Sequence, residues 1–335
     1  MMPKQFTRLP FRPLMFCGRW RSETRTPSVP LSFVLSQKYG MTRRSPNAAS
    51  LTTLRPSPSH LAEELRDFKD RLRHLGPGGI DMSLDDKNGL ATLILNNHER
   101  RNALSGKMMV QLSDAVDTLE SWERGVAMTL QGADGNFCSG ADLSLAREHL
   151  TTGEDGRLMS SLMTDTLERL RRLPIISVAV VDGSAIGGGA ELTTCCDFRI
   201  AGPESVIRFV QVKMGVSTGW GGGARLTGIV GRRAALRLLA WSPNVTAREG
   251  LAIGLLDDVA NEEGGAGEKA RDFLAAVLQR ESFGAIRAVK SVVAAADNVS
   301  PTVRGAEEGE FAALWGNTHN RMALKESPSR PSSKR

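Results

Sequence analysis

Two short glycine-containing loops constrain the fold of this 335-residue chain more than any other feature. They lie at residues 136–143 (NFCSGADL) and 183–192 (GSAIGGGAEL). Each follows a run typical of a β-strand, 126–130 and 175–181 respectively, and each is predicted to enter a helix at a small residue. Small residues let a main chain approach a ligand closely, and the first N–H groups of a helix have no partner within it. The pattern therefore predicts main-chain N–H donors at both loops.

Two of these donors, the N–H groups of Ala141 and Gly188, are predicted to converge on one oxygen. Such a pair is an oxyanion hole, which suits an enolate developing on a carbonyl compound. Asp142, Leu143 and Gly187 flank the two donors and are predicted to contact the substrate. A triple glycine alone is also typical of a flexible turn. It is neither a dinucleotide fingerprint nor a Walker A loop, so a phosphate cradle is not indicated.

Three further segments complete a family resemblance: 102–104 (NAL), 196–201 (CDFRIA) and 220–226 (WGGGARL). With the two loops, in this order, they resemble the enoyl-CoA hydratase/isomerase (crotonase) superfamily over residues 80–324. The resemblance implies an α/β fold, a ClpP-like spiral of ββα repeats with a C-terminal helical region. In the family that region packs subunits together, so a homotrimer or hexamer is expected. The substrate implied is an acyl-CoA thioester, with coenzyme A belonging to the substrate and no separate cofactor.

Hydrophobic periodicity agrees with this fold class. Strand-like runs are predicted at 89–95, 126–130, 175–181 and 198–201. Amphipathic helices are predicted at 105–122, where Ser105 would be the N-cap, and at 157–173. Beyond residue 224 the pattern is nearly all helical, over 234–241, 247–254, 268–279, 283–296 and 305–324.

The first 60 residues have a different composition, with ten Lys and Arg, a single acidic residue and eight of the fifteen prolines. We expect a disordered basic extension over 1–78, a catalytic domain over 79–325 and a disordered tail over 326–335. The net charge of +6 comes from the extension, so the folded part gives no reason to expect nucleic acid as a partner. The prolines oppose an import helix and favour the cytosol, and the Arg-rich, acid-poor composition leaves the mitochondrion as the alternative.

The four cysteines show no pairing or metal-binding spacing, and adjacent Cys195 and Cys196 are predicted to be small buried side chains. No apolar stretch reaches the length of a membrane span, so a soluble protein without a metal site is expected. Basic residues scattered over the C-terminal helices are expected to be surface charges: Lys269, Arg271, Lys290 and Arg304. Arg100 and Arg101 follow the first predicted strand, where the superfamily binds the nucleotide end of coenzyme A, and either is a candidate phosphate ligand.

The reaction type depends on residues 191 and 211. Hydratases of the superfamily use two glutamates, and the resemblance matches them to Glu191 and Gln211. A carboxamide neither gives nor takes a proton in the accessible range, so two-carboxylate acid–base chemistry is not expected. Decarboxylation needs no base to start, because loss of CO2 from a malonyl-type thioester leaves the enolate directly. Protonation of the enolate is then open to Glu191, a bound water or solvent. Trp220 is predicted to line the pocket or to pack in the core.

Three segments, 172–181 (RLPIISVAVV), 207–210 (IRFV) and 214–215 (MG), look most like superfamily members that decarboxylate ethylmalonyl-CoA. This resemblance implies decarboxylation of ethylmalonyl-CoA and methylmalonyl-CoA, and removal of side products in fatty-acid metabolism. Hydration or thioester hydrolysis on the same fold is the first alternative. A non-enzymatic relative that binds RNA through its basic extension is the second.

Overall fold

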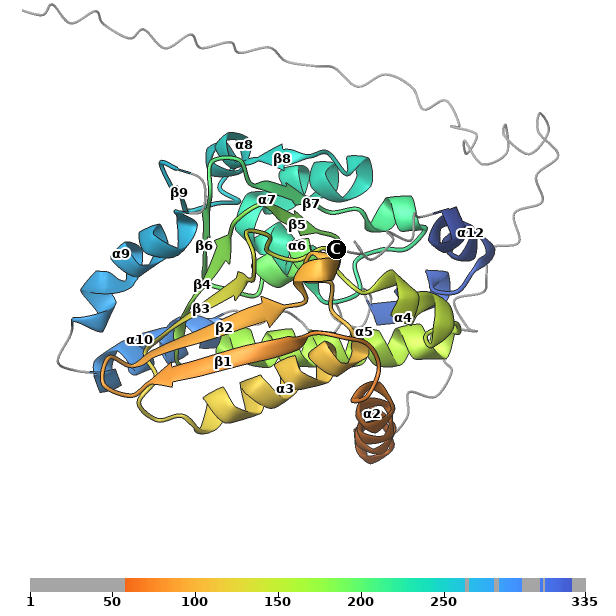
Figure 1. Cartoon of the computed structure of the whole chain (residues 1–335), viewed down its shortest axis with the longest axis horizontal. Helices are drawn as coiled ribbons and strands as arrows, with labels where there is room; N and C mark the ends of the chain where they lie inside the picture. The colour runs from red at the N-terminus through yellow and green to blue at the C-terminus, as the bar shows by residue number, and fades with distance from the viewer. Residues whose placement is uncertain (1–57, 263–264, 280–282, 297–307, 310, 327–335) are drawn as a thin grey trace, which may run out of the picture. The chain divides into compact units, whose positions relative to one another are not determined.

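The computed structural model describes residues 58–262, 265–279, 283–296, 308–309 and 311–326 (Figure 1). Its main sheet has six strands in the order β1-β2-β3-β4-β6-β9. Only the β1–β2 pair is antiparallel, and all the other pairs are parallel. The strands are β1 (Gly79–Asp85), β2 (Leu90–Asn96), β3 (Ala127–Gly132), β4 (Ile176–Val181), β6 (Phe198–Ala201) and β9 (Asp258–Val259).

A second, smaller sheet contains β5 (Ser184–Ile186), β7 (Val206–Arg208) and β8 (Val245–Thr246). Two isolated bridges, Leu104 with Ala141 and Cys138 with Ala185, extend this sheet into the loops that follow β2 and β3. The chain therefore contributes first to the main sheet and then to the second sheet in each turn of a spiral. This arrangement confirms the predicted ββα repeat and brings the two glycine-containing loops side by side.

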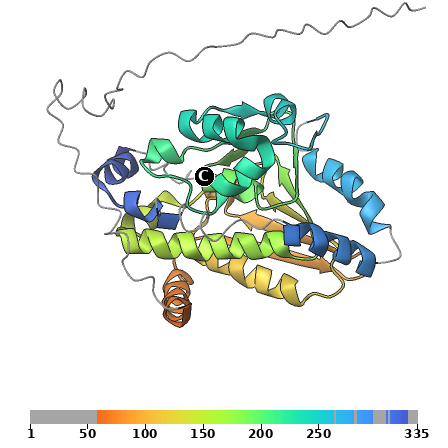
Figure 2. The same cartoon turned by 180° about the vertical axis from the view of Figure 1, so that it is seen from behind.

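Helices cover both faces of the main sheet. The α-helices are α2 (Pro58–Leu72), α3 (Gly106–Ser121), α4 (Leu143–Glu148), α5 (Gly153–Arg172), α6 (Gly188–Thr193), α7 (Gly222–Trp241), α8 (Ala247–Ala252), α9 (Ala266–Leu278), α10 (Phe283–Ala296) and α12 (Thr318–Glu326), with 3-10 turns η2 (His98–Arg100) and η3 (Gln211–Met214). In Figure 1, α3 lies along β1. Figure 2, seen from behind, shows α10 at the C-terminal end of α5. No helix in the described part of the chain is long and apolar enough to cross a membrane.

The last four residues of the central strand β4, 178–181, are all apolar, and the packing of the strand explains why. Ala179 and Val181 belong to the large core under α3 and α5, whereas Val178 and Val180 pack against α9. Successive side chains of a strand point to opposite faces, and a parallel strand covered on both faces needs apolar residues at every position. The predicted N-cap is also present, since the Ser105 hydroxyl accepts a hydrogen bond from the Met108 N–H.

Two boundaries differ from the sequence prediction. Strand β1 was not predicted, because its half-exposed edge position leaves only a weak apolar pattern. The catalytic domain begins before residue 79, because α2 buries Phe68 and Leu72 in the main core. The rest of the predicted extension, 1–57, and the tail beyond residue 326 lie outside the described residues. The helix predicted at 305–324 is described only in part, and α12 begins at Thr318.

The expectation that Lys290 is a surface charge is wrong. Its side chain is 5% exposed, and its Nζ forms an ion pair with Asp197 and donates to the Arg171 carbonyl at 2.8 Å. The second oxygen of Asp197 accepts hydrogen bonds from the N–H and hydroxyl groups of Ser177. This network fastens α10 to the chain at the start of β4 and β6.

Replacing Lys290 with methionine should therefore destabilise the fold while keeping the size of the side chain. We expect a loss of about 3 kcal/mol in the free energy of unfolding, at the lower end for a broken buried ion pair, because Asp197 is 20% exposed. Chemical denaturation of the purified variant measures this loss. Lys269→Met is the matched control, because its pair with Asp258 is exposed and should contribute less than about 1 kcal/mol. Equal losses in the two variants would contradict the assignment.

Candidate active site

The first loop is held so that the Ala141 N–H points away from the neighbouring segment at Leu104. The Leu104 N–H donates to the Gly140 carbonyl at 2.8 Å, and the Asp142 N–H donates to the Leu104 carbonyl at 2.9 Å. Alternate main-chain groups of an extended segment face opposite sides, so the N–H of Ala141 faces away from Leu104. On the other side of the loop, the Cys138 N–H donates to the Ser184 carbonyl and fixes the loop against β5.

The second loop brings Gly188 next to the first. Gly140 has φ +96°, and a Cβ placed on it would lie 3.1 Å from the Gly188 nitrogen and 3.0 Å from the Ile186 carbonyl oxygen. A Cβ on Gly189 would lie 2.1 Å from the Cys138 carbonyl oxygen. Glycine is therefore required at both positions, because only a bare Cα allows this approach. The structure thus brings together the two loops that contain the predicted donors, Ala141 and Gly188.

The thiol of Cys138 lies in the same loop but does not take part as a nucleophile. Burial raises the pKa of Cys138 to about 12, which a hydrogen bond from the Gly140 N–H only partly offsets. Because the thiolate is the nucleophilic form of cysteine, this side chain stays inert near neutral pH. Its function is packing beneath the loop.

Glu191 is 2% exposed, and both of its carboxylate oxygens are engaged. Oε2 accepts hydrogen bonds from the N–H groups of Trp220 at 2.9 Å and Gly222 at 3.0 Å. Oε1 accepts from the Gly219 N–H at 3.4 Å and from Gln211 Nε2 at 2.6 Å. All four partners are donors, so the arrangement suits an ionised carboxylate. Gly222 opens α7, where a negative charge also stabilises the helix dipole.

Arg225 completes the connection between α6 and α7. Its Nη2 donates to the Trp220 carbonyl at 2.6 Å, and its Nε donates to the Thr194 hydroxyl at 3.0 Å. The two helices are therefore joined by two contacts. Glu191 of α6 accepts hydrogen bonds at the start of α7, and Arg225 of α7 donates one to Thr194 at the end of α6. The sequence prediction missed Arg225 and the amide of Gly219, although the glycine run at 221–223 was a signal for a close main-chain approach.

Trp220 is buried in the core, with 3% of its surface exposed. A Cβ placed on Gly188 would lie 2.3 Å from the Trp220 ring. The ring therefore packs directly against Gly188 and supports the first turn of α6 from one side. Of the two interpretations left open by the sequence, packing in the core is confirmed, and lining of a substrate pocket stays a prediction.

The predicted substrate ligands near the first loop differ in their surroundings. Arg100 forms an ion pair with Asp142, whose other oxygen caps α4 by accepting from the Ser144 N–H at 2.8 Å. Leu143, the first residue of α4, is half-buried. Arg101 is exposed with φ +50°, and its carbonyl accepts from the Ser139 N–H. Arg101 is thus the more available cation, whereas Arg100 positions the loop.

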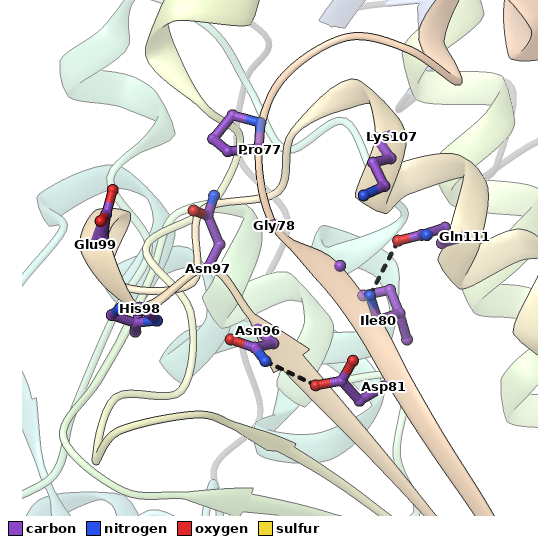
Figure 3. A pocket seen from close by; sticks show the side chains of 11 residues that line it. Pro77, Gly78, Ile80, Asp81, Asn96, Asn97, His98, Glu99, Lys107 and Gln111 are labelled. Atoms are coloured by element: carbon purple, nitrogen blue, oxygen red, sulfur yellow. Dashed lines mark hydrogen bonds between the residues drawn. The ribbon is translucent and has the colours of Figure 1, made fainter.

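Two cavities lie near these residues. One of about 220 Å³ is lined by Arg100, Asp142 and His149 among others, and so lies beside the first loop. The other, of about 430 Å³, lies between the start of β1, the end of β2 and α3 (Figure 3). Two hydrogen bonds join residues of its lining, since Asn96 donates to Asp81 and the Ile80 N–H donates to Gln111. Neither cavity is lined by Ala141 or Gly188.

Asn102 links the loops that surround the site, a role that the family motif alone did not reveal. It is fully buried with φ +57°, and its Nδ2 donates to the carbonyls of Ala133 and Asn136. The start of the first glycine-containing loop is thus tied to the segment that follows η2. Among the residues that the structure describes, no three His, Cys, Asp or Glu side chains gather closely enough to hold a metal ion.

Solved structures with the same fold include an enoyl-CoA hydratase from Mycobacterium avium subsp. paratuberculosis K-10. It is 21% identical, with a TM-score of 0.66, and the match covers 75% of this chain and 99% of that chain. An enoyl-CoA hydratase from Bacillus halodurans is 23% identical with a TM-score of 0.66, covering 73% and 98%. At these identities the likeness shows the fold.

Sequence relatives are more similar. A Xenopus laevis protein named ethylmalonyl-CoA decarboxylase is 39% identical over 260 residues, which cover 77% of this chain and 86% of the relative. Proteins of the same name from Danio rerio and Mus musculus are 41% and 42% identical; the matches cover 78% and 77% of this chain, and 87% and 80% of the relatives.

The enoyl-CoA hydratase/isomerase family model matches residues 85–329, a range that contains both glycine-containing loops and the Glu191–Gln211 pair. The Xenopus laevis relative matches over 77% of the chain, and the fold agrees with that of solved members. This chain belongs to the enoyl-CoA hydratase/isomerase family.

Proposed function

We propose that the protein is an acyl-CoA decarboxylase that converts ethylmalonyl-CoA to butyryl-CoA. The observation that carries the proposal is the Glu191–Gln211 contact beside a glycine-lined pair of main-chain donors. The site has the donors that an enolate needs and lacks the second carboxylate that hydration needs. Relatives of 39–42% identity named ethylmalonyl-CoA decarboxylase support the same reaction.

In the proposed reaction, the thioester oxygen accepts hydrogen bonds from the N–H groups of Ala141 and Gly188. The free carboxylate lies perpendicular to the thioester plane, so the electrons of the breaking C–C bond enter the carbonyl system as CO2 leaves. Preorganised main-chain donors stabilise the enolate oxygen without further rearrangement. An apolar environment around the leaving carboxylate favours the delocalised product over the localised charge.

The site is poorly suited to the two alternatives on the same fold. Hydration requires a group at position 211 that exchanges protons, and a carboxamide does not. Hydrolysis through a covalent acyl intermediate requires an activated nucleophile, and the buried neutral thiol of Cys138 is not one.

We extend the proposal to methylmalonyl-CoA, since one methylene in an apolar pocket changes binding by only about 1–3 kcal/mol. We also propose assembly into a trimer or a pair of trimers. Support comes from Val289, Val292 and Val293, which form an exposed apolar stripe on α10, because such stripes mark contact surfaces. The composition of the first 60 residues supports a cytosolic location for this assembly.

Replacing Gly188 with alanine should lower the rate of decarboxylation about 10²- to 10³-fold, the loss expected for one oxyanion donor. The added methyl group meets the Trp220 ring at 2.3 Å, so the first turn of α6 must shift and its N–H leaves the substrate oxygen. The measurement is kcat with ethylmalonyl-CoA, together with a thermal melt of the variant.

Gly228→Ala is the matched control, because a Cβ at that position on α7 contacts nothing within 4 Å. It should keep full activity. The double variant Gly188→Ala, Trp220→Leu makes room for the methyl group and should recover part of the lost rate. A folded Gly188→Ala protein with normal turnover would remove Gly188 from the site.

The reaction class is tested with two substrates. The wild-type protein should release CO2 from ethylmalonyl-CoA and hydrate crotonyl-CoA negligibly. Gln211→Glu should impair CO2 release, because it replaces a hydrogen bond of 2.6 Å with two carboxylates in contact and adds negative charge near an anionic substrate. A trace of hydration by this variant is also expected. Mass spectrometry of the products decides the matter: rapid hydration by the wild type without CO2 release would overturn the proposal.

A further inference from the structure

The side-chain amide of Gln211 has only one possible orientation. Its Nε2 donates to Glu191 Oε1 at 2.6 Å, and rotating the amide would bring two acceptors together. The carbonyl Oε1 must therefore face away from Glu191. Gln211 is 9% exposed, and Oε1 accepts no hydrogen bond from the residues that the structure describes. Buried polar atoms nearly always have a partner, so this acceptor indicates a bound donor.

The same amide lies beside the predicted enolate site. Glu191, its partner, follows Gly188 by three residues, less than one helical turn on α6. The preceding residue, Val210, also approaches this turn, since a Cβ on Gly187 would lie 3.2 Å from Val210 Cγ2. The Gly187 N–H donates to the Arg208 carbonyl at 2.8 Å, which fixes the start of α6 against β7. Residues 208–211 are therefore packed along the turn that contains the oxyanion donor.

The proposed reaction needs a proton on the α-carbon after CO2 has left, and neither side chain of the pair is suited to give it. Glu191 accepts four hydrogen bonds from N–H groups and is held as an anion. A carboxamide does not release a proton under these conditions. A water molecule that donates one hydrogen to Gln211 Oε1 still has its second hydrogen to give to a carbanion.

We propose that Gln211 is a positioning residue whose Oε1 holds the water that protonates the α-carbon on one face. The inference rests on the proposed decarboxylation. The C–C bond breaks and its electron pair passes to the enolate. The enolate then forms a C–H bond as an O–H bond of the water breaks, and the hydroxide left behind takes up a proton from bulk solvent while CO2 is released unchanged. Because the water is fixed, the new hydrogen enters from a single side.

The test is the stereochemistry of the product formed in D2O. Wild-type protein acting on ethylmalonyl-CoA should give butyryl-CoA with one deuterium at C2 in a single configuration. Gln211→Met removes the acceptor at nearly constant size, so deuterium should enter from both faces and stereospecificity should be lost. CO2 release should change much less, because the C–C bond breaks before the proton arrives. Chiral analysis of the hydrolysed butyrate, with CO2 measured in parallel, gives both readouts.

Two variants separate this role from a structural one. Gln211→His keeps a donor for Glu191 and a second ring nitrogen as acceptor, so it should keep a single configuration. Gln279→Met makes the same substitution at the exposed end of α9 and should behave as wild type. Retained stereospecificity in folded Gln211→Met overturns the inference alone, as does a mixed product from folded Gln211→His. Absence of CO2 release by the wild type overturns the proposed function and the inference together.

Discussion

The buried carboxylate of Glu191 is the interaction on which the arrangement of this site depends. A charge with 2% exposure is tolerated only where donors replace water, and here main-chain amides and one carboxamide do so. Because the amides belong to the start of α7, the carboxylate fixes the position of α7 relative to α6. Arg225 of α7 adds a second connection, because it donates hydrogen bonds to the Thr194 hydroxyl at the end of α6 and to the Trp220 carbonyl. The helix that presents Gly188 is therefore held at both ends.

The spiral supplies the other half of the geometry. Each turn places a strand in the main sheet and then a short segment in the second sheet, so consecutive loops are neighbours in space. The bridge between Cys138 and Ala185 joins the two loops directly. Glycines at 140 and 189 remove the side chains that would keep the two backbones apart. The predicted donors are thus positioned by main-chain contacts, and the side chains nearby mainly support them.

Much of this was predictable from the sequence, because the informative features are local. The apolar run that became β4 and the cap at Ser105 depend on neighbouring residues only. Lys290 could not be predicted, because its burial depends on Asp197, 93 residues away. The burial of α2 was not predicted for a similar reason. The composition around it is that of a polar extension, and its apolar face is evident only from its packing against α3 and α5. The main-chain amides that donate to Glu191 also could not be predicted, because they belong to a loop about 30 residues further along the chain.

The carboxamide at position 211 changes the electrostatics of the site more than its shape. Glutamine is close in size to glutamate, so the contact with Glu191 is kept while one negative charge is removed. The remaining charge on Glu191 is directed into the amides of Gly219, Trp220 and Gly222. A dianionic pair would repel a substrate that itself carries a free carboxylate, and in a low-dielectric interior that repulsion is strong. In the proposed reaction, a site with one acidic group can therefore accept an anionic acyl group, and proton transfer by residue 211 is not needed because C–C cleavage itself generates the enolate.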